Sequence, residues 1–141
     1  MHETSIRVVL ADDSAVVRQK LGGLLADQKG VEVVAAAQNA VEAIEAIRVN
    51  HPHAVILDLR MPQGGGLRVL REYSTAAWKP VMIVLTNYSN LQFRERCMAA
   101  GADYFLDKSS EFDQIPRLLT RLIRPDALSG RCLANESIAN S

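Results

Sequence analysis

The sequence lacks the features of a membrane-spanning or secreted protein. No apolar run approaches the ~20 residues that a helix needs to cross a bilayer. The amino terminus has no basic region followed by an apolar run and a small-residue cleavage site, so it does not resemble a signal peptide. The two cysteines, Cys97 and Cys132, are too few for a disulfide framework. We therefore expect a cytoplasmic protein with reduced thiols and no association with a membrane.

The chain also lacks an excess of charge of either sign. Its 16 Lys and Arg residues balance 16 Asp and Glu residues, so the formal net charge is zero. Such a chain has no global attraction to nucleic acid, and we expect no direct nucleic-acid binding by it. Its partners must then be selected by local surfaces.

Internal repeats and low-complexity tracts are absent, and 141 residues correspond to one domain with a core of its own. We expect this domain to occupy residues 1–124. Residues 125–141 are small and polar, which predicts a short carboxy-terminal tail, either mobile or folded as one surface helix. A further output domain needs at least about 50 residues, so none is expected here. Whether the chain is complete or a piece of a longer protein stays open.

Five short apolar runs predict the strands of a parallel sheet. The runs are rich in Val and Ile, which favour strands. They begin 22 to 26 residues apart, an interval that holds one strand, one helix and two short loops. The runs start at Ile6, Val31, Ala54, Pro80 and Ala102. We therefore expect an α/β fold, a flavodoxin-like doubly wound sandwich whose five-stranded parallel sheet has the order 2-1-3-4-5.

The segments between these runs have helical periodicity. The expected helices cover residues 14–27, 40–50, 66–75, 90–100 and 110–124. Ser14 is the candidate N-cap of the first helix. Val41, Ile44 and Ile47 stand at helical spacing in the second, which predicts a shared buried face. Pro116 predicts a late start or a mild kink in the last helix.

Polar side chains follow four of the five expected strands. The first run stops at Asp12 and Asp13, the third at Asp58, the fourth at Thr86, and the fifth just before Lys108. Because parallel strands point the same way, these groups should gather at the carboxyl edge of the sheet, where open α/β sheets bind ligands. In the order 2-1-3-4-5 the ligand crevice lies between the first and third strands, which carry the three aspartates.

Three crowded carboxylates repel one another, so they either shift their pKa values or recruit a cation. Oxygen ligands without a nearby His or Cys suit a hard ion such as Mg²⁺, which also favours water and phosphate oxygens. Lys108 supplies a mobile positive charge for a phosphate, and the Thr86 hydroxyl supplies one more donor. An aspartate beside Mg²⁺ and a lysine is suited to accept a phosphoryl group. A purely helix-capping role for Asp12 or Asp13 remains the simpler alternative.

This set of residues resembles the receiver domain of two-component response regulators over roughly residues 5–124. The matching pieces are the Asp12–Asp13 pair, Asp58 within "DLRMP", Thr86 after "VMIVL", and "GADYFLDK" with Lys108. The resemblance implies that Asp58 accepts a phosphoryl group from a sensor histidine kinase or a phosphotransfer protein. It describes a phosphoacceptor switch, not an enzyme that acts on free substrates.

The resemblance also implies a Mg²⁺ site formed by Asp12, Asp13, Asp58 and the backbone carbonyl of Arg60. Pro62 and the glycines at 64–66 would shape the loop after Asp58, because proline keeps the preceding residue out of a helix and glycine permits a sharp turn.

The switch implied by the resemblance uses Thr86 and Phe105. The Thr86 hydroxyl would move to the phosphate and Phe105 would fill the vacated space. The affected surface would be the fourth helix, fifth strand and fifth helix, which is expected to bind a downstream protein partner or to form a homodimer. The fourth helix includes Leu91, Phe93, Arg94, Cys97 and Met98, and the sequence leaves open which of them face outward. Cys97 is expected to be a small apolar residue of the helix.

Two residues near the site depart from the usual pattern: Ser109, and Asn87, which follows Thr86 where a small Ala or Gly is common. Ser109 follows Lys108 where many receivers have proline, which leaves the isomer of that peptide bond open. Arg60 and Tyr88 flank the expected path of attacking water, so they should influence the lifetime of the phosphorylated state.

Two other functions remain as alternatives. One is an interaction module of the same fold that works without phosphorylation. The other is a haloacid-dehalogenase-like phosphatase, a class that needs a second Asp two residues after its nucleophile. Here Arg60 follows Asp58 and Ser14 follows Asp12 at that spacing, which disfavours the phosphatase.

Overall fold

The computed structural model describes residues 5–123, so the expected tail at 125–141 lies outside the described residues. Strands and helices alternate throughout. The elements are β1 (Ile6–Ala11), α1 (Ala15–Ala26), β2 (Val31–Ala37), α2 (Ala40–Asn50), β3 (Ala54–Leu57), α3 (Gly65–Tyr73), β4 (Val81–Thr86), α4 (Leu91–Ala99), β5 (Tyr104–Asp107) and α5 (Gln114–Ile123). Within this range no helix is long and apolar enough to cross a membrane.

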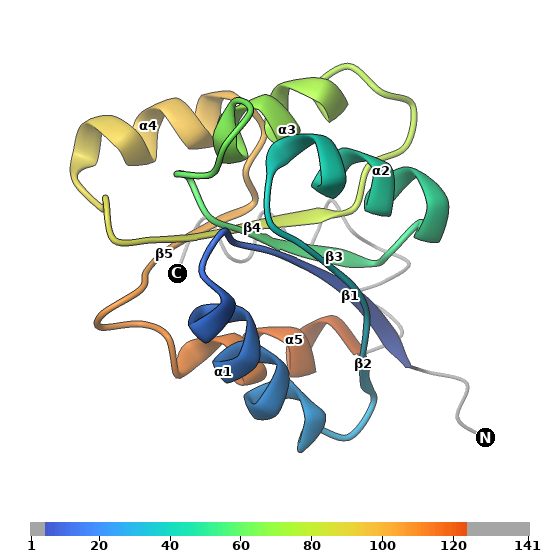
Figure 1. Cartoon of the computed structure of the whole chain (residues 1–141). Coiled ribbons are helices and arrows are strands. Elements are labelled where there is room, and N and C mark those ends of the chain that lie inside the picture. The colour runs from blue at the N-terminus through green and yellow to red at the C-terminus, as the bar shows by residue number, and fades with distance from the viewer. Residues whose placement is uncertain (1–4, 124–141) are drawn as a thin grey trace.

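The five strands form one parallel sheet in the order β2-β1-β3-β4-β5, which confirms the predicted topology. Helices α1 and α5 cover one face, and α2, α3 and α4 cover the other (Figure 1). The order of the strands reverses between β1 and β3, which lie side by side. This is the position at which doubly wound sheets bind ligands.

The core has two layers because successive side chains of a strand point to opposite faces. In β1, Val8 and Leu10 pack toward α1 and α5, whereas Val9 and Ala11 pack toward α2, α3 and α4. All four side chains are buried. Since both faces are covered, the strands read as continuous apolar runs instead of alternating ones.

The helix boundaries follow local capping chemistry. The Ser14 hydroxyl accepts a hydrogen bond from the Val17 N–H at 3.2 Å, which confirms Ser14 as the N-cap of α1. Helix α5 begins at Gln114, four residues later than the first residue of the expected segment, Ser110. Pro116 lies in its first turn, where the missing N–H is least costly, so the late start is the outcome.

The buried face of α2 differs from the prediction. Val41 is 45% exposed, and the buried side chains are Ala40, Ala43 and Ile47. These three residues form a stripe at i, i+3 and i+7, and Val41 lies one residue off that stripe. Because the two alanines are small, the helix reaches the sheet through them, and the larger valine is left at the surface.

The loop after Asp58 is built on glycines that approach the backbone of the site. Gly65 has φ of +66°, and a Cβ there would collide with the Leu59 carbonyl oxygen. A Cβ on Gly66 would lie 2.6 Å from the Asp58 carbonyl oxygen. Glycine is therefore required for α3 to begin so close to Asp58.

Two matched glycine substitutions test this requirement. Gly66→Ala should destabilise the fold by about 1–3 kcal/mol, because the new methyl group displaces the Asp58 backbone. Gly23→Ala in α1, where a Cβ meets nothing within 4 Å, should stabilise it by about 0.5–1 kcal/mol. Urea denaturation measures both changes, and an unchanged midpoint for Gly66→Ala would contradict the account.

Candidate functional site

Three aspartates meet at the carboxyl ends of β1 and β3. Asp12 and Asp13 directly follow β1, and Asp58 directly follows β3, the neighbouring strand. The Asp58 N–H donates to the Ala11 carbonyl at 2.8 Å, which continues the pairing of the two strands up to the site. One carboxylate oxygen from each aspartate lies within 4.8 Å of the others. The structure therefore brings together the three residues that the sequence placed at this edge.

The three carboxylates differ in their exposure. Asp12 and Asp58 are only 3% and 7% exposed, whereas Asp13 lies at the surface. The cluster is thus open to solvent at Asp13 and shielded from solvent at Asp12 and Asp58. A ligand bound by all three aspartates would therefore stay partly hydrated.

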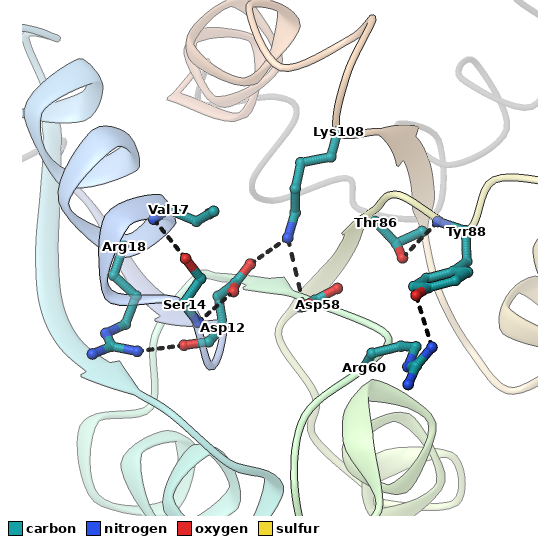
Figure 2. Close-up of polar contacts among 9 residues, drawn as sticks. All are labelled: Asp12, Ser14, Val17, Arg18, Asp58, Arg60, Thr86, Tyr88 and Lys108. Atoms are coloured by element: carbon teal, nitrogen blue, oxygen red, sulfur yellow. Dashed lines mark hydrogen bonds and ion pairs between the residues drawn. The ribbon is translucent and has the colours of Figure 1, made fainter.

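Asp12 is held in place by both of its carboxylate oxygens. Its Oδ1 accepts a hydrogen bond from the Ser14 N–H at 2.9 Å, and its Oδ2 accepts from the Lys108 ammonium at 2.7 Å. Capping of α1 falls to Ser14, as described above. Asp12 is therefore more than a helix cap: one of its oxygens is directed at the lysine across the site (Figure 2).

Lys108 reaches the cluster from the loop after β5. Its Nζ lies 2.7 Å from Asp12 Oδ2 and 3.5 Å from Asp58 Oδ2, and its side chain is 12% exposed. Its backbone N–H donates to the Thr86 carbonyl at 2.8 Å. The described residues contain no cis peptide bond, so the bond between Lys108 and Ser109 is trans.

The electrostatics of Asp58 follow from these neighbours. Burial, and then the adjacent Asp12 carboxylate, raise the pKa of Asp58 above its ordinary value, and Lys108 opposes both effects. The ionised form of Asp58 is therefore costly, although the Lys108 ammonium lies 3.5 Å from it. A second positive charge at the cluster would relieve that cost.

Thr86 is the last residue of β4, and Phe105 is the second residue of β5. Thr86 is fully buried, and its hydroxyl oxygen accepts a hydrogen bond from the Tyr88 N–H at 3.1 Å. Phe105 is 6% exposed and packs on the α4 side of the sheet, whereas Tyr104 packs on the α5 side. The Arg94 guanidinium lies 6.0 Å from the centre of the Phe105 ring.

Arg60 and Tyr88 bridge the loops after β3 and β4. The Arg60 guanidinium donates to the Tyr88 hydroxyl at 2.7 Å and lies 4.8 Å from the centre of its ring. Figure 2 shows this pair on the Thr86 side of Asp58, away from Asp12. The backbone carbonyl of Arg60 stays a predicted metal ligand.

A pocket of about 450 Å³ adjoins the carboxylates. It is lined by Asp13, Arg60, and the loop that contains Met61 and Pro62.

The structure shows which residues of α4 face outward, a point that the sequence left open. Cys97 is fully buried beneath the helix, so it does not contribute to the outward surface. Leu91 and Met98 are 67% and 39% exposed, and Arg94 is also exposed. Periodicity alone did not show which side of this short, polar helix faces the sheet.

Sequence reasoning also missed the role of Asp107. Its carboxylate accepts hydrogen bonds from Ser89, Ser109 and Ser110, residues of two different loops. The available signal was an aspartate followed two residues later by serine, a pattern that forms local side-chain-to-backbone turns.

Comparison with known proteins agrees with this geometry. A family model described as the response regulator receiver domain matches residues 8–120. The chain is 36% identical over 104 residues to protein-glutamate methylesterase/protein-glutamine glutaminase 1 of Oleidesulfovibrio alaskensis, covering 73% of this chain and 28% of that protein. It is 34% identical over 113 residues to the transcriptional regulatory protein PdtaR of Mycobacterium tuberculosis, covering 79% of this chain and 54% of the relative.

Solved structures give the same result. A two-component response regulator of the LuxR family from Aurantimonas sp. SI85-9A1 superposes with a TM-score of 0.78 at 27% identity, covering 84% of this chain and 85% of that one. The chain spans between about a quarter and about a half of the length of the two curated relatives named above. The family match covers most of the described residues and includes every site residue discussed above, so the chain belongs to the response regulator receiver domain family of two-component systems.

Proposed function

We propose that this receiver domain accepts a phosphoryl group on Asp58 and that the modification changes the α4–β5–α5 surface for a protein partner. The observation that carries the proposal is the convergence of three carboxylates with one ammonium, in which Lys108 Nζ lies 2.7 Å from Asp12 and 3.5 Å from Asp58. A site of this composition is matched to a divalent cation and a phosphoryl group together.

The donor set fits Mg²⁺. Asp12, Asp13 and Asp58 each offer a carboxylate oxygen, and Asp13 is open to water, which Mg²⁺ retains in most protein sites. The Arg60 carbonyl is the fourth proposed protein ligand. When bound, the ion would neutralise charge on the phosphoryl oxygens. It would also offset the repulsion that raises the pKa of Asp58.

Asp58 is the nucleophile in this proposal. One of its oxygens forms a bond to phosphorus while the donor's bond to phosphorus breaks. With a phosphohistidine of a sensor kinase or phosphotransfer protein, the broken bond is phosphorus–nitrogen, and the freed imidazole regains a proton. Lys108, already 3.5 Å from Asp58, is placed to pair with the incoming phosphoryl oxygens.

The response of the surface would begin at Thr86. In the present structure its hydroxyl oxygen accepts from the Tyr88 N–H, so moving toward a phosphate on Asp58 would release the loop that precedes α4. Phe105 has no hydroxyl, so its ring packing alone would report the change. Leu91 and Met98, which are exposed seven residues apart on α4, are proposed contacts for a protein partner or a second copy of the chain.

Incubation with acetyl phosphate and Mg²⁺ tests the proposal directly. The intact mass should rise by one phosphoryl group, and removal of Mg²⁺ should abolish the gain. Asp58→Ala should prevent it, whereas Asp27→Ala, which removes a carboxylate at the far end of α1, should not. Phosphorylation that persists in Asp58→Ala would overturn the assignment, and its absence from the wild type would favour a phosphorylation-independent module.

Removing the Asp58 charge should stabilise the fold in Mg²⁺-free buffer. Asp58→Asn relieves the repulsion from Asp12, and we expect a gain of about 1 kcal/mol, or roughly 4 °C in melting temperature. Lys108→Met should have the opposite effect, because it leaves two buried carboxylates without their cation. Added Mg²⁺ should raise the melting temperature of the wild type more than that of Asp58→Asn. Equal melting temperatures for all three proteins would contradict this electrostatic description.

The Arg60–Tyr88 pair should lengthen the lifetime of the phosphorylated state by restricting water. Tyr88→Ala should shorten the half-life by roughly tenfold, equivalent to about 1.4 kcal/mol in the hydrolysis barrier. Tyr88→Phe keeps the ring and removes the hydrogen bond from Arg60. It therefore shows whether the ring alone restricts water or whether the hydrogen bond that orients the ring is also needed. The half-life is read from the loss of phosphoprotein after the phosphate donor is removed, and an unchanged value in Tyr88→Ala would refute the role.

A further inference from the structure

The carboxylate of Asp107 connects the two loops that follow β4 and β5. Its Oδ1 accepts three hydrogen bonds from the loop after β5: from the Ser109 N–H at 2.8 Å, the Ser109 hydroxyl at 2.6 Å and the Ser110 N–H at 3.2 Å. Its Oδ2 accepts a hydrogen bond from the Ser89 hydroxyl, in the loop after β4. Both oxygens are therefore used, and each serves a different loop.

The backbone of Asp107 is fixed as well. Its N–H donates to the Glu111 side chain at 2.7 Å, and its carbonyl accepts from the Glu111 N–H at 2.8 Å. Residues 107–111 thus form a closed turn that contains Lys108. The Ser109 hydroxyl, followed by the Ser89 hydroxyl, holds the pKa of Asp107 well below its usual range, so the carboxylate stays an acceptor at both oxygens.

The position of Lys108 depends on this turn. A lysine side chain is long and flexible, so the placement of its ammonium requires a fixed backbone. The Lys108 N–H is bonded to the Thr86 carbonyl, and its Nζ lies 2.7 Å from Asp12. The next residue is Ser109, so no proline ring restrains the backbone there. The hydrogen bonds of Asp107 supply the restraint on that side.

We propose that Asp107 is a positioning residue for phosphoryl transfer: its carboxylate holds the Lys108 turn so that the Lys108 ammonium meets Asp12 and Asp58. The inference rests on the proposed function, because it assigns Asp107 an effect that is exerted through Lys108. Ser89 lies three residues after Thr86, so the same carboxylate also ties the Thr86 loop to the Lys108 loop.

Two substitutions at one position separate positioning from general stability. Asp107→Ala removes both carboxylate oxygens, which accept the hydrogen bonds from Ser89, Ser109 and Ser110. Asp107→Asn keeps an oxygen for the N–H groups of Ser109 and Ser110, and its amide can donate to the Ser89 oxygen. With acetyl phosphate and saturating Mg²⁺, we expect the phosphorylation rate constant to fall about tenfold in Asp107→Ala. A loss of this size is typical when a residue that orients a functional side chain is removed. Asp107→Asn should recover most of the rate, and Ser110→Ala, which keeps its backbone N–H, should match the wild type.

A double-mutant comparison shows whether the effect passes through Lys108. In a Lys108→Met background, Asp107→Ala should cause no further loss of rate, because the ammonium that it positions is already gone. Mg²⁺ affinity should not fall in Asp107→Ala, because the three aspartates that would hold the ion are intact. A full additional tenfold loss in the Lys108→Met background, or failure of Asp107→Asn to recover the rate, would overturn the proposal.

Amide hydrogen exchange gives a readout that does not need phosphorylation. In Asp107→Ala the Lys108 amide should exchange faster, while the Leu10 amide in β1, which is paired on both sides by β2 and β3, stays protected. Asp107→Asn should restore protection at Lys108. Unchanged exchange at Lys108 in Asp107→Ala would reject the positioning role. If the wild type takes up no phosphate, the proposed function fails, and the exchange data still decide whether Asp107 holds the Lys108 turn.

Discussion

The site depends on the attraction between the Lys108 ammonium and the carboxylates of Asp12 and Asp58. Two nearly buried carboxylates within a few ångströms are unfavourable, and one ammonium offsets that cost only in part. Burial, and then the Asp12 carboxylate, raise the pKa of Asp58, and Lys108 opposes both effects only in part. In the function that we propose, this imbalance favours the binding of a divalent cation and of a phosphoryl group that shares it.

The fold brings these charges together through a general property of parallel sheets. All strands deliver their carboxyl ends to one edge, and the reversal of strand order places β1 beside β3 there. The glycines after Asp58 allow α3 to begin directly beside the site. The loops after β4 and β5 complete it, and hydrogen bonds between those loops link Thr86, Lys108 and Asp107 into one unit. In the function that we propose, a change at Asp58 would pass through Lys108 to these two loops and so to α4.

Most of the fold and the charged residues of the site were predictable because they obey patterns that are local in sequence. Buried strands show as apolar runs, and their ends show as polar residues. The contacts between loops were not predictable in the same way. The bond between Arg60 and Tyr88 and the bonds of Asp107 depend on how separate loops fold toward each other, which no periodicity encodes. The outward side of α4 could not be assigned from the sequence, because this helix is short and polar and its apolar stripe is weak.

The central claim is that Asp12, Asp13 and Asp58 together hold a divalent cation. Anomalous scattering from crystals grown with Mn²⁺, which shares the oxygen preference of Mg²⁺, tests it most directly. We expect one strong anomalous peak within about 2.5 Å of carboxylate oxygens from this cluster, with the Lys108 ammonium still facing Asp58. The absence of a peak there at saturating Mn²⁺, or a peak only elsewhere on the molecule, would contradict it.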